Sequence, residues 1–467
     1  MTDELWRTGA LELASRIAAG EVSSREVVEA HLNRIDEVNP RLNAVVRRLD
    51  EQALAEADAA DRHRAAGGQL GPLHGVPFTV KENIDVAGTP TTNSVVALAE
   101  AVSPTDAPVV ERMRAAGGVV LARTNLPDFG LRVFTESSLH GITRNPWNAE
   151  RTVGGSSGGE AAALASGMTP IGLGNDLGGS LRNPAHCCGI ASIKPSTGVI
   201  PSATSIPPTE GGIMSQLMAV EGVMARHVAD VRAGFDIVAG PHLRDPLALP
   251  VRIADLAPGR PLRVAVAADT PGGSTHPGVA AAIRAVADRL ADDGAEVTEA
   301  VPASFERSLE LWATLLIADV RAQLPLLEMV MGEDGIRFLG FADEIIPSVD
   351  LASFGALLME RIAVAKEWAE FLDRYDVLLT PVWSQPAPPH GSDVASLEAG
   401  QATLEMIRPV LPANLLGLPA AVTPAGVVDG LPVGAHLVAT RFADHRALAA
   451  AQRVEDLIGT ITPIDPR

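Results

Sequence analysis

Short apolar runs alternate with stretches of helical spacing along this chain, and this alternation constrains its fold more than any other feature. Continuous apolar runs are typical of strands buried on both faces. The runs lie at 76–80, 119–122, 171–173, 264–266, 377–379, 420–422 and 435–438. Helical spacing separates several of them, at 107–116, 160–166, 276–293 and 445–457. The pattern predicts an α/β fold with helices on both faces of one extended sheet.

The N-terminal region is expected to be helical and to pack on this sheet. Apolar residues recur at helical spacing over 11–18, and a capping-box pattern spans 23–26. Pro40 should end the helix that follows the capping box. An alanine-rich third helix is expected over 51–66, before two glycines.

Composition and charge exclude several classes of protein. The 37 basic and 57 acidic side chains give a net charge of −20, which should repel nucleic-acid phosphates. No apolar run approaches the length of a membrane span, and no charged segment precedes an apolar one at the N-terminus. Cys187 and Cys188 are neighbours in the sequence, and adjacent cysteines do not form an ordinary low-strain disulfide. Two unpaired cysteines fit a reducing compartment. We therefore expect a cytoplasmic monomer or homodimer that binds neither nucleic acid nor membrane.

Two glycine-serine clusters carry the clearest chemical signal. They span 154–159 and 176–182 and place Ser156 and Ser180 24 residues apart, with Lys81 upstream. Glycine turns and serine caps are often only structural. Together, however, these residues offer hydroxyls, an amine and unobstructed backbone N–H groups, which attack on a carbonyl requires. The hypothesis is a serine nucleophile assisted by a lysine base.

From Arg151 onward the chain resembles the amidase signature family, through RTVGGSSGGEAAALASG followed by PIGLGNDLGGSLRNPAHCCGIASIKPS. The resemblance implies one domain over 1–467 built around a large mixed sheet. In it, helices of 1–66 pack on the sheet and 305–370 forms a variable helical pocket cap. Further stretches follow in the family's order at 71–77, 79–88, 123–129, 143–147, 376–381, 414–420 and 430–434.

The resemblance also implies roles for individual residues. Ser180 would be the nucleophile, and Ser156, after a cis peptide bond, would relay a proton between Ser180 and Lys81. Lys81 ends an apolar run, where burial would disfavour its charged form and allow it to act as a base. The expected oxyanion hole consists of backbone N–H groups of Leu177, Gly178 and Gly179.

Other residues are expected to support this site. Ser157 should hold its loop by hydrogen bonds, and the resemblance implies that Asp176 and Arg182 brace the nucleophile. Asn175 departs from the family pattern, which more often has serine or threonine there, and an amide has a different reach. The predicted substrate-binding residues are Asn125, Leu126 and Phe129.

The segment 305–370 is least like the family. Leu309, Trp312, Leu316 and Val320 share one helical face, and leucines and methionines crowd the next residues. Most of this stripe is expected to be ordinary core, but it also predicts a cap that shapes the pocket for an apolar group. The expected substrates are neutral amides with an apolar or aryl group, with esters and carbamates (urethanes) as additions.

Two alternative enzymes remain open from the sequence. Residues 155–159 also satisfy the G-x-S-x-G elbow of α/β-hydrolases, which would make Ser157 the nucleophile. The histidines available to such an esterase include His186, His227, His390 and His436. An amidotransferase subunit of the same family is the other alternative, although the acidic balance favours a free-standing hydrolase.

Nucleotide and metal binding are not expected. Glu160 stands where a phosphate-binding loop needs lysine, and Leu177 stands where a dinucleotide-binding loop needs its third glycine. The run His186-Cys187-Cys188 cannot easily surround one tetrahedral ion. We predict that the enzyme needs no metal and no cofactor.

Overall fold

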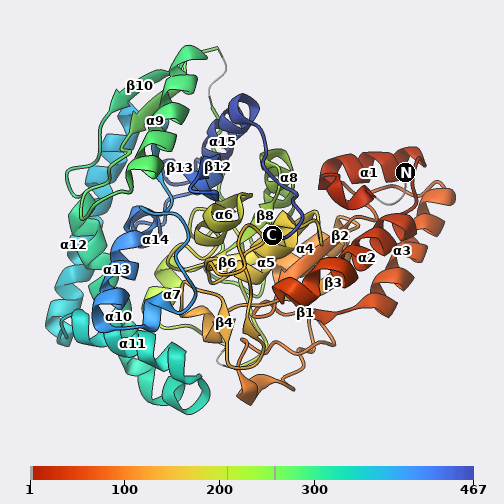
Figure 1. Ribbon diagram of the computed structural model, residues 1–467, viewed down its shortest axis with the longest axis horizontal. Coiled ribbons are helices and arrows are strands. Elements are labelled where there is room, and N and C mark those ends of the chain that lie inside the picture. Colours follow the sequence, from red (N-terminus) through yellow and green to blue (C-terminus); the bar gives the residue numbers. More distant parts are fainter. Residues whose placement is uncertain (1–3, 208, 257–258) are drawn as a thin grey trace.

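A mixed sheet runs through the computed structural model, which describes residues 4–207, 209–256 and 259–467 (Figure 1). In the described residues this sheet has eleven strands in the order β1-β3-β2-β6-β8-β7-β12-β13-β11-β9-β10. Their bounds are β1 (Val45–Arg48), β2 (Pro77–Lys81), β3 (Val119–Thr124), β6 (Ile171–Asp176), β7 (Ala191–Lys194), β8 (Val220–Ala225), β9 (Arg263–Val266), β10 (Glu296–Glu299), β11 (Val377–Pro381), β12 (Ala420–Val428) and β13 (Leu431–Val438). A separate hairpin pairs β4 (Glu136–Ser137) with β5 (Gly141–Ile142).

The sheet combines parallel and antiparallel pairing. Strands β3, β2 and β6 are parallel near one end, and β11, β9 and β10 are parallel at the other. The strands between β6 and β11 pair antiparallel. The predicted α/β class and the large mixed sheet are therefore confirmed.

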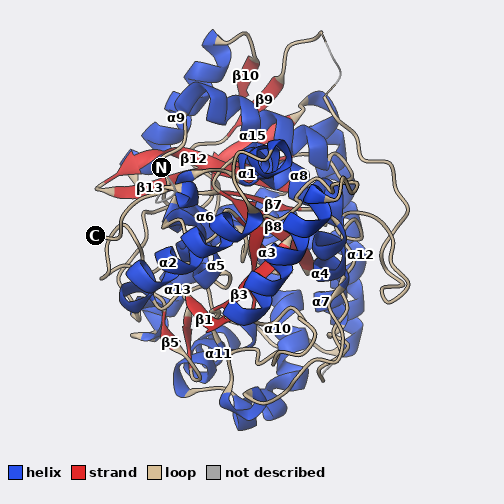
Figure 2. Cartoon of the chain, turned by 90° about the vertical axis from the view of Figure 1, so that its right-hand side faces the viewer, coloured by secondary structure: helices blue, strands red, loops and turns tan. Residues whose placement is uncertain are grey.

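Helices surround the strands (Figure 2). The bounds of the helices are α1 (Ala10–Ala19), α2 (Ser24–Leu42), α3 (Asp50–Ala65), α4 (Pro108–Ala115), α5 (Gly158–Ala165), α6 (Arg182–Cys188), α7 (Ile213–Met218), α8 (Val228–Val238), α9 (Pro277–Asp292), α10 (Phe305–Val330), α11 (Glu333–Ile345), α12 (Leu351–Arg374), α13 (Leu397–Met406), α14 (Leu411–Leu415) and α15 (Asp444–Ile458). Helices α5, α6, α10, α12 and α14 bury apolar side chains in one core cluster. Helices α1, α4, α8, α9 and α15 bury theirs in the other. The sheet is thus covered on both faces.

The N-terminal helices follow the expected pattern with one exception. Ser23 and Glu26 form the predicted capping box of α2, and α3 packs against α2 and β3. The prediction that Pro40 ends α2 is wrong, because the helix continues to Leu42 and closes at Asn43 in the left-handed conformation. Pro40 lies in the last turn, where its missing N–H removes only one hydrogen bond near the helix end.

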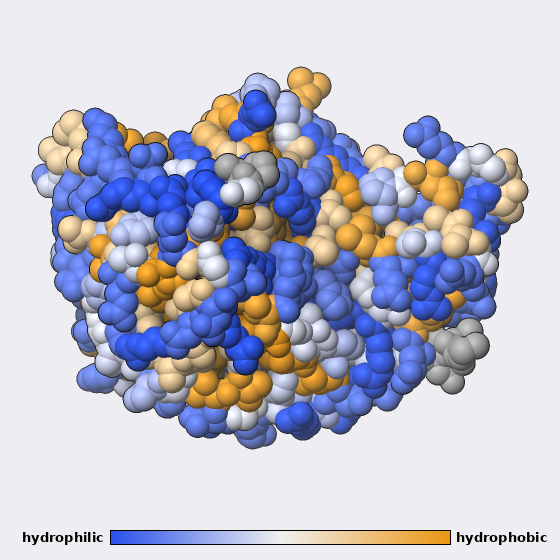
Figure 3. Space-filling view, turned by 90° about the horizontal axis from the view of Figure 1, so that it is seen from above, coloured by the Kyte–Doolittle hydropathy of each residue, from blue (hydrophilic) through white to orange (hydrophobic). Residues whose placement is uncertain are grey.

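The face of the molecule drawn in Figure 3 is mostly polar. Hydrophilic side chains cover much of the face seen in Figure 3, with apolar patches between them. No helix in the described part of the chain has the length and apolar character needed to cross a membrane.

Candidate active site

Two neighbouring parallel strands bring the candidate residues together. Strands β2 and β6 pair in parallel, so their carboxyl ends meet at one edge of the sheet. Lys81 is the last residue of β2, and Asp176 is the last residue of β6. The loops that carry Ser156 and Ser180 lead into α5 and α6 and meet at the same edge, where the N–H of Ser157 donates to the carbonyl of Ser180.

Lys81 is the central polar group of this edge. Its side chain is fully buried, and Nζ lies 2.7 Å from Ser156 Oγ and 2.6 Å from Asn175 Oδ1. Burial lowers the pKa of Lys81 to about 7, although Glu221, Asp176 and Glu160 favour the charged form. A substantial share of the amine is therefore uncharged near neutral pH, as a base requires.

The first glycine-serine cluster has the backbone that the resemblance implied. The peptide bond between Gly155 and Ser156 is cis. Ser157 links the two clusters, because its N–H donates to Ser180 O at 3.1 Å and its hydroxyl donates to Asn175 O at 3.3 Å. Ser180 is buried, with 7% of its surface exposed, and its hydroxyl has no hydrogen-bond partner among the described residues.

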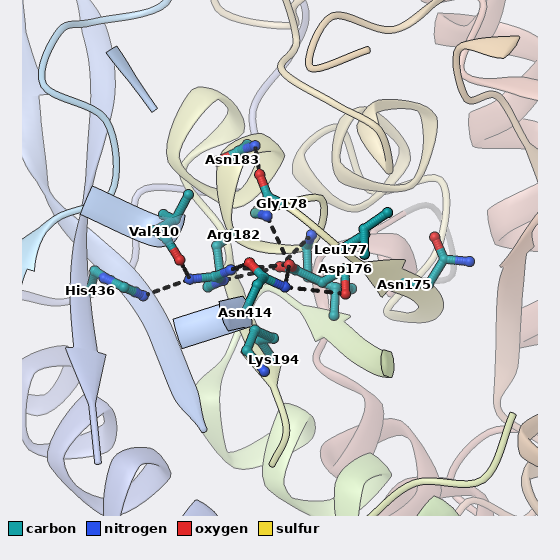
Figure 4. Close-up of polar contacts among 12 residues, drawn as sticks. Asn175, Asp176, Leu177, Gly178, Arg182, Asn183, Lys194, Val410, Asn414 and His436 are labelled. Atoms are coloured by element: carbon teal, nitrogen blue, oxygen red, sulfur yellow. Dashed lines mark hydrogen bonds and ion pairs between the residues drawn. The ribbon is translucent and has the colours of Figure 1, made fainter. Parts of the chain in front are cut away.

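Asp176 and Arg182, which flank Ser180 in the sequence, form a buried ion pair (Figure 4). The carboxylate of Asp176 also accepts the N–H groups of Gly179 and Leu181, at 2.8 and 3.1 Å. Burial would raise the pKa of Asp176, but the Arg182 guanidinium outweighs it and holds that pKa well below its usual range. Asn414 donates to Asp176 at 2.9 Å and accepts from Arg182 at 2.6 Å.

One of the three N–H groups predicted to form the oxyanion hole is already hydrogen-bonded within the protein. The N–H of Gly179 is occupied by Asp176, and the φ of +96° at Gly179 is one that glycine adopts readily. Within the described ranges, the N–H groups of Leu177, Gly178 and Ser180 have no acceptor. These three are therefore the donors available to an oxyanion.

Asn183 joins the two clusters and was missed in the sequence. Its amide donates to the carbonyls of Gly155 and Gly178, both at 3.2 Å, and its oxygen accepts from Trp383 Nε1 at 2.8 Å. Nothing in the local sequence distinguishes Asn183 from the other residues of α6, because the two loops meet at it only in the folded chain.

The three residues predicted to bind substrate, Asn125, Leu126 and Phe129, lie in different surroundings. Asn125 is buried, and its amide donates to Gly141 O and Thr143 Oγ1, both at 3.0 Å. It braces a loop, which does not favour a substrate contact. Leu126 is also fully buried, whereas Phe129 packs against a small apolar cluster at α10 and α11. That cluster contains Leu327, Met331 and Leu339.

Helix α10 reaches the second glycine-serine cluster through Trp312. The indole N–H donates to Leu177 O at 3.4 Å. A Cβ at Gly178 would lie 2.7 Å from the indole ring, so only glycine allows this close approach. The sequence placed Trp312 on the apolar stripe but gave no indication of this contact.

The histidine-dependent alternative has no geometric support. His186 binds Gln385 O and the N–H of Gly434, and His436 contacts Arg182 and Thr380. No histidine ring of the described chain is hydrogen-bonded to Ser157 or to another serine. The described residues also contain no group of three His, Cys, Asp or Glu arranged to hold a metal ion.

Fold and sequence together define a hydrolase that acts on carbon–nitrogen bonds. The chain belongs to the Amidase family, whose model matches residues 26–448. It is 39% identical to an indoleacetamide hydrolase of Bradyrhizobium diazoefficiens over 98% of this chain and 88% of that protein. It is also 34% identical to a subunit of the glutamyl-tRNA(Gln) amidotransferase of Salinispora tropica, over 99% of both chains. The solved structure of 6-aminohexanoate cyclic dimer hydrolase complexed with substrate matches with a TM-score of 0.86 and 30% identity, over 99% of both chains.

Proposed function

We propose that this enzyme cleaves the acyl C–N bond of small or medium neutral amides through a relay of Lys81, Ser156 and Ser180. The observation that carries the proposal is the buried Lys81 amine, 2.7 Å from the Ser156 hydroxyl beside the Ser180 loop. A buried amine with a pKa of about 7 is a competent base at neutral pH.

The chemistry proceeds in two stages. Neutral Lys81 accepts a proton from Ser156, which takes one from Ser180 as Ser180 attacks the carbonyl carbon. The contact between the two hydroxyls forms when substrate binds, as catalytic hydrogen bonds often tighten in the complex. Backbone N–H groups stabilise the oxyanion, and the relay then protonates the leaving amine. Water then attacks the acyl-enzyme and gives a proton to the relay, which returns it to Ser180 Oγ as the acyl–oxygen bond breaks.

An apolar or aryl acyl group fits the surroundings of this site. Trp312 of α10 contacts the backbone of Leu177, and Phe129 packs with the cluster of Leu327, Met331 and Leu339. Two relatives are named for indoleacetamide and for the 6-aminohexanoate cyclic dimer, and an amide group carries no charge near neutral pH. Esters and carbamates pass through similar tetrahedral intermediates and are proposed as additional substrates.

A substrate series tests this function. We expect kcat/KM to be higher for arylacetamides, anilides and aryl carbamates than for acetamide or glutamine. Faster turnover of acetamide than of every apolar substrate would refute the apolar preference but leave the relay intact. Preferred hydrolysis of glutamine would instead favour a role in an amidotransferase, the activity named for the Salinispora relative.

A further inference from the structure

Asn175 makes direct contact with the Lys81 amine. Lys81 Nζ donates to Asn175 Oδ1 at 2.6 Å, and Asn175 Nδ2 donates to Asn83 Oδ1 at 3.1 Å. Asn175 follows Leu173 and Gly174 on β6, which pairs with the strand that ends at Lys81. The side-chain amide of Asn175 therefore lies between Lys81 and Asn83, in the loop that follows β2. Its oxygen and its nitrogen each have one hydrogen-bond partner.

The contact with Asn175 affects the orientation of the neutral Lys81 amine. Such an amine has two N–H bonds and one lone pair, and only the lone pair can take the proton of Ser156. A carbonyl oxygen accepts hydrogen bonds and never donates them, so Asn175 Oδ1 must engage an N–H of Lys81. A serine or threonine hydroxyl at this position could instead donate to the lone pair and compete with Ser156.

We propose that Asn175 is a positioning residue that turns the lone pair of Lys81 toward Ser156. This inference rests on the proposed function, in which Lys81 is the base. It concerns a residue at which this chain departs from the usual hydroxyl, and it explains why the departure is compatible with the relay.

The charges around Lys81 explain why the acceptor is neutral. Glu160 on α5, Asp176 on β6 and Glu221 on β8 all favour the lysine ammonium, and Glu221 is paired directly with Asn175 across the sheet. Burial outweighs these carboxyl groups and keeps the pKa of Lys81 low, and it also raises the pKa of Glu160 and of Glu221 to about 7, so both are partly protonated near neutral pH. A fourth carboxylate at position 175 would touch Nζ and stabilise the ammonium further, so an uncharged acceptor preserves the base.

The experiment compares Asn175→Asp and Asn175→Leu with the wild type. The first keeps the acceptor but adds a charge, and the second has nearly the same shape without an acceptor. The matched control is Asn33→Asp, which adds the same charge at an exposed position on α2. The readout is the rate at which an aryl sulfonyl fluoride labels Ser180, measured against pH and located by mass spectrometry. This rate reports on the base whatever the substrate is.

We expect Asn175→Asp to move the ascending limb of the labelling rate upward by about 1–3 pH units, with recovery at high pH. Asn175→Leu should lower the rate about tenfold or more at every pH, and Asn33→Asp should match the wild type. If Asn175→Leu does not fold by circular dichroism, Asn175→Ser replaces it. The shorter hydroxyl should lower the labelling rate without changing the KM of an amide substrate.

An Asn175→Asp profile that superimposes on the wild type would overturn this inference, as would an Asn175→Leu or Asn175→Ser enzyme labelled at the wild-type rate. Failure of the proposed function gives a different result. In that case the wild type itself is not labelled at Ser180, or its labelling rate does not rise with pH.

Discussion

At the residue scale, the relay predicts unequal losses among the serines. Ser180→Ala removes the attacking atom and should lower kcat by at least about 10⁴-fold, because little beyond binding remains. Lys81→Ala and Ser156→Ala should each lower kcat by orders of magnitude. Steady-state kinetics on folded variants measure these losses. Near-normal turnover by Ser180→Ala, together with an inactive Ser157→Ala or histidine variant, would show that the nucleophile is assigned incorrectly.

The titration of Lys81 predicts the direction of the pH dependence. Only the neutral amine accepts a proton, so kcat/KM should rise with pH through a midpoint near the Lys81 pKa of about 7. Between that pH and the usual lysine pKa of about 10.4, the unfolded chain binds more protons at this group, so its contribution to stability also rises with pH. A kcat/KM profile with no ascending limb between pH 5 and 9 would contradict a lysine base.

At the element scale, helix α10 should determine which substrates are accepted. Trp312→Ala removes the indole from the Leu177–Gly178 backbone and should lower kcat/KM for aryl amides by about tenfold or more, with a smaller loss for acetamide. Trp368→Ala is the matched control, since Trp368 of α12 stacks on Phe305 and donates a hydrogen bond to Ser308, both on α10.

Both tryptophan variants should lose about 3–5 kcal/mol of stability, because each removes a large buried side chain. Only Trp312→Ala should change the ratio of kcat/KM between anilides and acetamide. An unchanged ratio in Trp312→Ala, or the same change in both variants, would mean that the cap does not select substrates through Trp312.

Most strands of the sheet, but not all of them, could be predicted from the sequence. The apolar runs predicted β2, β3, β6, β9, β11, β12 and β13, but β1, β7, β8 and β10 were not predicted. Strands β1 and β10 have polar residues and lie at the sheet edges, and β8 contains Glu221 and Gly222. Their strand conformation depends on neighbours supplied by tertiary packing rather than on a local pattern.

Part of the candidate site could also be predicted from the sequence, and part of it could not. Lys81, Ser156 and Ser180 could be proposed because each lies in a local motif, and the structure brings the first two into contact. The contacts of Asn175 with Lys81 and of Trp312 with Leu177 join residues far apart in the chain. No periodicity or spacing encodes such pairings, so these parts of the site emerged only from the fold.

At the scale of the whole molecule, activity should not depend on a metal ion. No group of three ligating side chains gathers anywhere in the described ranges, and in the proposed mechanism Lys81 is the base and backbone N–H groups bind the oxyanion. We expect kcat to persist after exhaustive chelation and dialysis, measured against an untreated sample. A loss of activity that a divalent ion restored would contradict this expectation.

The Asn414 contact has a consequence for how the enzyme is made. Asn414 lies 238 residues beyond Asp176, and β12, which follows it, lies between β7 and β13 in the middle of the sheet. During translation, Lys81, Ser156 and Ser180 all leave the ribosome well before Asn414, which braces the Asp176–Arg182 loop that carries Ser180. A fragment ending at residue 400 therefore contains all three residues of the proposed relay but should not be labelled by a sulfonyl fluoride, whereas the full chain should be. The nascent protein should therefore gain its reactive serine only when its synthesis is nearly complete.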